Sequence, residues 1–248
     1  MIAANIERVR EQIVKACHRV NRDPSEVTIV AVTKERSVYQ IDEVIASGLS
    51  DIGENKIQEA QIKFWELCGE GRERSHFRWH MIGHLQTNKV KDAVQIFDLI
   101  HSVDSLKLAK TIDNQAAKYG KIQEVLIEVN TSGETEKFGC APEAVEGLVK
   151  EVATFKNIKL NGLMTMAPEV ANPEDARPYF RMLRELRDTI YGLPVTLPAK
   201  GRPDLSPVLS MGMSNDFEVA VEEGATMVRI GRAILGDQQK ILKLREKI

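Results

Sequence analysis

Cysteine is scarce in this sequence, and its positions form no recognisable pattern. The three cysteines are Cys17, Cys68 and Cys140. An odd number of cysteines without Cys-x-x-Cys spacing predicts neither a disulfide framework nor a zinc ribbon. We therefore expect a reducing compartment, and a cytoplasmic location is the simplest setting.

Long hydrophobic runs and an excess of one charge are lacking as well. No stretch approaches the roughly 20 apolar residues that cross a bilayer, and the opening MIAANIERVREQIVKA places charges before any apolar run. We therefore expect neither a secretory signal nor a membrane partner. The 34 Lys and Arg residues against 36 Asp and Glu residues leave a net charge of −2, which argues against a nucleic-acid partner.

Several catalytic motifs are also missing. The sequence contains no Walker A loop, GxGxxG fingerprint, HExxH helix or GxSxG elbow, so nothing favours an ATPase, dinucleotide, zincin or α/β-hydrolase function. His76, His80 and His84 are spaced by four, but no nearby cysteine or acidic residue completes a convincing metal site. We expect no metal, and expect most of these histidines to be structural or surface residues.

What the 248 residues do contain is a repeated alternation of strand and helix patterns, with 43% hydrophobic residues spread along the whole chain. A helical apolar period runs from Ile6 to Val20, before the first strand. Short apolar runs then predict eight strands at Val27–Thr33, Asp51–Glu54, Arg78–Ile82, Leu99–Val103, Glu124–Val129, Lys159–Met164, Pro207–Met211 and Met227–Ile230. Helix patterns follow each of them; Ser37 and Ser105 can begin two of these helices, and Ser214 or Asn215 a later one.

Eight strand–helix units in about 220 residues fit an α/β fold, a single (β/α)8 TIM barrel with an extra N-terminal helix. A doubly wound open sheet is the competing architecture. The proline-rich segment Gly192–Pro207 lies between a helix and a strand, so we interpret it as an insertion rather than a domain boundary. We expect residues 1–248 to form one domain.

In such a barrel the active site lies at the C-terminal ends of the strands. The residues that this rule selects are Lys34, Asn55, His84, Asn130, Met164–Met166, Ser210–Ser214 and Arg229–Arg232. Lys34 follows the run VTIVAVT, and a partly desolvated lysine loses its proton more easily and can form a Schiff base with an aldehyde. A solvated lysine at a strand end is the alternative.

Two further candidates are a phosphate-binding loop after the seventh strand and a buried arginine in the eighth. The stretch Ser210–Asp216 combines Gly212 with the hydroxyl of Ser214, and the loops after the last two strands of a barrel often bind phosphate; Ser214 as a helix cap is the alternative. Arg229 lies inside the last strand and needs a partner. A pyridine nitrogen or a carboxylate would serve, and a salt bridge to Glu54 or Glu128 is the plain alternative.

Seven stretches of the chain resemble the pyridoxal phosphate homeostasis protein family. They are Val30–Lys34, Ile52–Glu59, Trp79–Lys89, Ile100–Asp104, Asn161–Met166, Leu209–Asp216 and Met227–Gly236. Each match is weak alone, but together and in this order they are specific, and they cover the chain from about Val27 to Gly236.

The resemblance implies a barrel like the N-terminal domain of alanine racemase, holding pyridoxal 5′-phosphate as its cofactor. It implies that Lys34 forms the Schiff base, that Ser214 and the backbone N–H groups of Gly231 and Arg232 grip the phosphate, and that Arg229 faces the pyridine nitrogen. It further implies that Asn55, His84 and Met211 line the pocket. Position 232 departs from the family pattern, since a small hydroxyl residue is expected where this chain has Arg232.

The function we expect is a pyridoxal phosphate carrier rather than an efficient catalyst, with apo-enzymes that use the cofactor as possible recipients. The chain ends about a dozen residues after Gly236, so we expect no second domain to supply a racemase's opposing base or its dimer contacts. A monomer follows from the same expectation. The alternatives are a small amino-acid racemase and a phosphate-binding barrel enzyme without the cofactor. The sequence also leaves open whether Lys63, Lys137 or another surface lysine offers a second aldehyde site.

Overall fold

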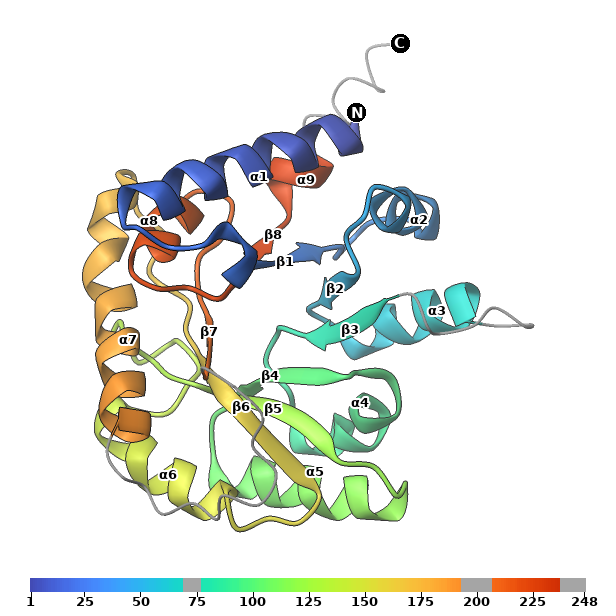
Figure 1. The fold of residues 1–248 in the computed structure, drawn as a ribbon. Coiled ribbons are helices and arrows are strands. Elements are labelled where there is room, and N and C mark those ends of the chain that lie inside the picture. Colours follow the sequence, from blue (N-terminus) through green and yellow to red (C-terminus); the bar gives the residue numbers. More distant parts are fainter. Residues whose placement is uncertain (69–76, 193–206, 237–248) are drawn as a thin grey trace.

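Eight parallel strands close into a barrel in the order of the chain (Figure 1). The computed structural model describes residues 1–68, 77–192 and 207–236. The strands are β1 (Thr28–Val32), β2 (Asp51–Glu54), β3 (Arg78–Met81), β4 (Leu99–Val103), β5 (Gln123–Glu128), β6 (Ile158–Met164), β7 (Val208–Ser210) and β8 (Met227–Ile230). The barrel closes where β1 pairs with β8, with Val30 opposite Arg229.

Helices follow the strands and cover the outside of the barrel. The α-helices are α1 (Ile2–Arg19), α2 (Val38–Ala46), α3 (Ile57–Cys68), α4 (Val90–Ile96), α5 (Leu106–Lys118), α6 (Val145–Val152), α7 (Arg177–Gly192), α8 (Phe217–Glu222) and α9 (Arg232–Leu235). Short 3-10 turns lie at Pro24–Glu26, Thr87–Lys89, Pro142–Ala144 and Pro173–Ala176. Right-handed strand–helix–strand units of this kind place the helices on the outer face of a parallel sheet.

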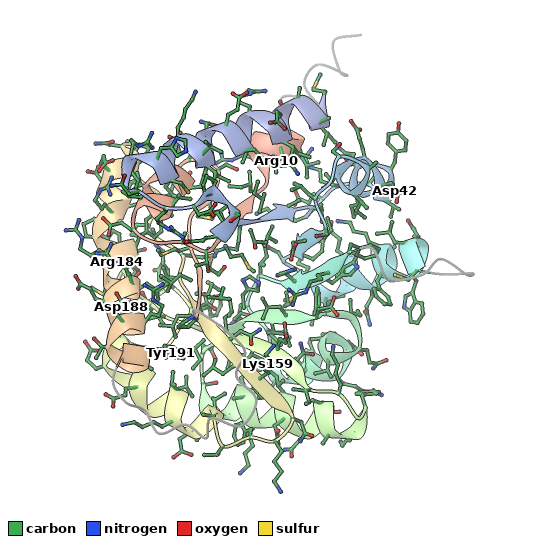
Figure 2. All side chains as sticks on the ribbon, in the orientation of Figure 1. Arg10, Asp42, Lys159, Arg184, Asp188 and Tyr191 are labelled. Atoms are coloured by element: carbon green, nitrogen blue, oxygen red, sulfur yellow. The ribbon has the colours of Figure 1, made fainter. Side chains whose placement is uncertain are left out.

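Side chains alternate between the barrel interior and the helix layer, as the period of a strand requires. The apolar interior is a small cluster formed by Val30, Leu99, Leu126, Met164 and Met227. On β5, Val125 and Ile127 belong instead to the large cluster shared with the helices. Figure 2 shows that side chains fill the inside of the ring of strands. The barrel is therefore a packed core, and polar positions in it need a specific explanation.

The helix α1 is the addition to the eight-unit pattern. It lies across α8 and α9 (Figure 1), and buries an apolar stripe that includes Ile6, Val9 and Ile13. Its last residue, Arg19, pairs with Glu218 and Glu222 of α8. The helix thus covers the units that follow β7 and β8, which carry candidate site residues.

The predicted fold is confirmed, since the sheet is a closed barrel and not an open one. Ser37 and Ser105 begin α2 and α5 as expected, each accepting a hydrogen bond from the first turn. The helix predicted to begin at Ser214 or Asn215 begins instead at Phe217. Most of Gly192–Pro207 lies outside the described residues, and the single-domain expectation stays a prediction. No helix in the described ranges combines the length and apolar character needed to cross a membrane.

Candidate functional site

The candidate residues line one continuous arc at the C-terminal end of the barrel. In the closed order, β7, β8, β1, β2 and β3 are successive neighbours. Ser214, Gly231, Lys34, Asn55 and His84 follow these five strands in turn. Strand closure thus brings together residues that are up to 197 positions apart in the chain, from Lys34 to Gly231.

Lys34 combines an exposed side chain with an anchored backbone. It lies in the turn after β1. On one side of it, Thr33 is buried and its hydroxyl donates to Glu54 Oε1 at 2.6 Å. On the other side, the Glu35 amide donates to the Glu59 carboxylate. The amine therefore has rotational freedom while its Cα is held in place, which suits a lysine that must reach a ligand in the barrel mouth.

Lys63 supplies the centre of this anchor and is not a surface lysine. Its side chain is buried, and its Nζ donates to the Thr33 carbonyl at 2.6 Å, to Glu54 at 2.7 Å and to Glu59 at 2.6 Å. Because all three donor hydrogens are engaged, the amine is not available to an aldehyde. The pairing also removes Glu54 as the salt-bridge partner considered for Arg229.

The loop after β7 is built around Gly212 and Asp216. Gly212 has φ +91°, and a Cβ there would lie 2.5 Å from the Cβ of Ala220, so the position requires glycine. The Asp216 carboxylate accepts from the Met213 amide at 2.6 Å, and the Phe217 amide donates to the Met213 carbonyl at 2.9 Å. This turn moves the start of α8 beyond Ser214, which explains the misplaced helix start.

The Ser214 hydroxyl bonds to a different helix from the one that the sequence suggested. Its Oγ accepts from the Ala233 amide at 3.3 Å, in the first turn of α9. The hydroxyl therefore lies beside the N-terminal amides that follow Gly231. Arg232, the departure from the family pattern, is exposed and leads α9. The backbone N–H groups of this turn and one hydroxyl are the donors that a phosphate group would use.

Arg229 is buried in the barrel interior with two fixed hydrogen bonds. Its side chain is inward-facing on β8 with only 3% of its surface exposed. Nη1 donates to Ser210 Oγ at 2.7 Å, and Nη2 donates to the Thr165 carbonyl at 2.9 Å. Two bonds from two nitrogen atoms fix the plane of a guanidinium group. Both partners belong to strand ends that the sequence selected.

The electrostatics around Arg229 follow from its burial. Burial lowers the pKa of the guanidinium to about 10, and the carboxylates of Glu128 and Asp216 oppose that shift. Arg229 therefore stays protonated at neutral pH. Glu128 has 2% of its surface exposed, and burial raises its pKa to about 7, against the influence of Arg229. Its Oε2 has no hydrogen-bond partner within the described part of the chain.

The other pocket residues have different settings. Asn55 is half-buried between β2 and α3. Met211 is fully buried and belongs to the core cluster between barrel and helices, so its side chain does not line the mouth. His84 stacks on Phe138 with ring centroids 3.7 Å apart, and its Nδ1 lies 3.6 Å from Asp104 Oδ2. His84, Asp104 and Ser105 border a hollow of about 410 Å³.

Some of the remaining candidates have structural roles, and one residue beside the hollow was not predicted. Asn130 binds its own loop, with Nδ2 donating to the Glu134 carbonyl at 2.8 Å. His80 is buried inside the barrel, His76 lies outside the described residues, and the described ranges contain no cluster of three metal-binding side chains. Asp104 was missed as the partner of His84; its signals were its place at the end of a strand and in the family-like stretch Ile100–Asp104.

The fold is a barrel of the kind found in alanine racemase. A crystal structure of alanine racemase from Clostridium difficile superimposes with a TM-score of 0.68 over 92% of this chain and 59% of that one, at 14% identity. At that identity the likeness concerns the fold alone. The family model "Alanine racemase, N-terminal domain" matches residues 2–239.

Closer relatives narrow the assignment. The Pyridoxal phosphate homeostasis protein of Aquifex aeolicus is 43% identical over 94% of this chain and 97% of its own length, and that of Pseudomonas aeruginosa is 39% identical over 95% of each. The structure of PipY from Synechococcus elongatus with PLP bound is 30% identical, with a TM-score of 0.76 over 95% of this chain and 100% of PipY. The chain belongs to the pyridoxal phosphate homeostasis protein family.

Proposed function

We propose that this protein binds pyridoxal 5′-phosphate, holds it as a Schiff base on Lys34, and takes part in intracellular cofactor and amino-acid homeostasis without efficient turnover. The observation that carries the proposal is Arg229, a buried guanidinium fixed by Ser210 and Thr165 at the centre of the barrel. A buried cation held this firmly needs an acceptor for its remaining N–H groups. A pyridine nitrogen is such an acceptor, and the PipY structure with PLP supports the choice.

The residues present fit the cofactor at three points. Ser214 and the first amides of α9 offer donors for a phosphate, Arg229 offers donors for a ring nitrogen, and Lys34 offers an exposed amine on an anchored backbone. Bound pyridoxal phosphate would supply an aldehyde that condenses with the Lys34 amine. The chain's own task is to orient that amine and to hold the two ends of the ligand.

Arg229 also explains why turnover would be poor. A permanent positive charge beside the ring nitrogen keeps that nitrogen unprotonated, so the ring is a weak electron sink. This feature suits storage and release more than carbanion chemistry. We propose that the protein works as a monomer in the cytoplasm, buffers a reactive aldehyde and releases it to apo-enzymes.

A spectroscopic titration tests the binding site. Wild-type protein mixed with pyridoxal phosphate should develop a visible absorbance band at a stoichiometry of one, and Lys34→Ala should lose it. Lys137→Ala is the matched control, since Lys137 is a half-buried lysine in the loop after β5; it should retain the band. A band of equal strength in Lys34→Ala would refute the assignment.

A turnover assay separates the carrier from its rival, an amino-acid racemase. Purified protein carrying the cofactor is incubated with a panel of L-amino acids, and chiral chromatography measures the D-enantiomer. We expect no conversion above the rate of free pyridoxal phosphate. Conversion that Lys34→Ala abolishes would establish an enzyme.

A separate assay measures transfer of pyridoxal phosphate to an apo-enzyme. It follows the recovery of the apo-enzyme's activity in the presence of an excess of a trap for the free aldehyde.

A further inference from the structure

Five polar side chains on five strands form one continuous hydrogen-bond chain through the barrel interior. Asp51 of β2 lies 2.9 Å (Oδ1) from His80 Nε2 on β3, and His80 Nδ1 lies 2.9 Å from His101 Nε2 on β4. His101 Nδ1 lies 3.0 Å from Ser210 Oγ on β7, which accepts from Arg229 on β8 at 2.7 Å. The chain joins a carboxylate at the start of β2 to the cation of the candidate site.

Burial makes every link of this chain necessary. His80, His101 and Ser210 have no exposed surface, and the Asp51 side chain is 14% exposed. A buried polar group without a hydrogen-bond partner destabilises the folded protein, so each of these buried groups needs its neighbour in the chain. Apolar residues at His80 and His101 would fill the barrel as well, as Val30 and Leu99 do nearby. Packing alone therefore gives no reason for this set of side chains.

The two ends give the chain one direction. A guanidinium only donates hydrogen bonds, and a carboxylate only accepts them. Burial raises the pKa of Asp51, but the hydrogen bonds from His80 and Ser50 and the charge of Arg78 outweigh burial and lower it, so Asp51 is ionised. Burial holds the pKa of His101 well below its usual value, and the charge of Arg229 adds to that effect, so His101 is neutral.

With one ring proton on each histidine, only one arrangement of protons satisfies every link. Arg229 donates to Ser210, Ser210 donates to His101 Nδ1, His101 Nε2–H donates to His80 Nδ1, and His80 Nε2–H donates to Asp51. We propose that Asp51, His80, His101 and Ser210 are positioning residues that fix the Arg229 guanidinium through this one-way chain. The inference rests on the proposed function for its ligand, because Arg229 is the group assigned to the ring nitrogen.

The charged groups that face the chain are few. Arg78 acts on Asp51 and His101 from β3, and Glu128 of β5 and Asp216 after β7 act on Arg229. The Thr165 carbonyl adds the second bond to Arg229. Thr165 holds Arg229 Nη2, and the hydrogen-bond chain holds Nη1 through Ser210. Loss of the hydrogen-bond chain therefore removes one of the two bonds that fix the guanidinium. The effect should reach the ligand although Asp51 lies at the opposite end of the strands.

The first test needs no ligand. Long-range ¹H–¹⁵N NMR spectra of ¹⁵N-histidine-labelled protein at pH 7.5 report which ring nitrogen carries the proton. We expect the proton on Nε2 of both His80 and His101, with Nδ1 bare. A proton on Nδ1 of either residue would reverse a link and overturn the proposal. His101→Gln and His80→Gln assign the signals.

The second test measures the effect at a distance. Asp51→Asn removes the acceptor-only end, and we expect the dissociation constant for pyridoxal phosphate to rise about threefold to tenfold, with a shifted absorbance maximum. Glu124→Gln is the control, because Glu124 is a carboxylate near the same end of the barrel, bound to Arg78 and Lys159 outside the chain. It should leave the dissociation constant within twofold of the wild-type value and the absorbance maximum unchanged.

The outcomes separate this inference from the proposed function. A colourless wild-type protein would refute the cofactor, while the histidine spectra of the ligand-free protein would still decide the direction of the chain. If wild type binds and Asp51→Asn keeps both the wild-type affinity and the wild-type absorbance maximum, the positioning role is wrong. If Asp51→Asn does not fold, Asp51→Glu takes its place, because it keeps an acceptor-only carboxylate. A shifted absorbance maximum in Asp51→Glu, with unchanged histidine tautomers, would then contradict the one-way chain.

Discussion

The environment of Glu128 conflicts with the chemistry of a carboxyl group. It is an inward-facing carboxyl of β5 whose pKa burial raises to about 7 from the usual 4.5, and one of its oxygens is unpartnered within the described residues. In the unfolded chain the same carboxyl ionises freely near its usual value. Folding therefore becomes less favourable as the pH rises from about 4.5 to 7, because the folded protein must either keep the proton or bury a charge.

Glu128→Gln should remove this penalty. A neutral amide of the same shape does not titrate, so we expect the free energy of unfolding to rise relative to wild type by about 1–3 kcal/mol at pH 8 and by much less at pH 5. Urea unfolding at the two pH values measures the difference.

Glu124→Gln provides a control with the opposite sign. Burial raises the pKa of Glu124, but the hydrogen bond from Lys159 and the charge of Arg78 outweigh burial and lower it. Its contribution is present above pH 4.5 and is lost only at lower pH, so the variant should lose nearly the same stability at pH 8 and at pH 5. Equal effects of pH on the two variants would contradict the account of Glu128.

Single residues were predictable where position alone determines the chemistry. The rule that barrel sites lie at strand ends selected Lys34, Ser214 and Arg229: Lys34 and Ser214 follow β1 and β7, and Arg229 lies within β8. Their roles in binding stay predictions. The partners were not predictable. Ser214 faces Ala233 and Arg229 faces Ser210 because β7 and β8 are neighbours in space, and contacts of this kind depend on the register of distant strands. Lys63 was misjudged as a surface residue for the same reason.

Among the elements, β6 carries the tightest backbone approach. Gly162 has φ +153°, and a Cβ at this position would lie 2.1 Å from the Val208 carbonyl oxygen on β7. The pairing of β5 with β6 shifts register between Val125 and Leu126, next to Gly162. The absence of a side chain at Gly162 is what allows β7 to lie against β6.

Gly162→Ala should therefore separate the two strands and destabilise the protein by about 2–4 kcal/mol. Gly147→Ala is the matched control, since Gly147 is exposed in α6 with no atom within 4 Å of its added Cβ. In a helix interior that change should stabilise by about 0.5–1 kcal/mol. Thermal unfolding of both variants compares the signs, and a tolerated Gly162→Ala would contradict the close approach.

Element boundaries were predictable to within one or two residues wherever a strand is buried on both faces. Leu99–Val103 and Met227–Ile230 are found with the predicted bounds. The exception is the start of α8, where the Asp216 side chain binds the Met213 amide. The local sequence around a serine does not show whether it begins the next helix or bonds to a different one. Only the tertiary structure distinguishes them.

At the scale of the whole molecule, closure of the barrel creates the site. The pairing of β1 with β8 places Val32, two residues before Lys34, against Gly231. The sequence predicted the closed barrel that brings the ends of these two strands together. What the pattern could not show is the polar interior. Asp51, His80 and His101 lie on three different strands, and their connection becomes visible only when these neighbouring strands are aligned in register.

The central claim is that Lys34 holds pyridoxal phosphate covalently. The most direct measurement is borohydride reduction of the protein mixed with pyridoxal phosphate, followed by peptide mass mapping. We expect the visible band to disappear on reduction, and the mass of the reduced pyridoxyl phosphate adduct to be found on the peptide that contains Lys34. A colourless protein with Lys34 unmodified would contradict the account and leave a phosphate-binding barrel with an unidentified substrate.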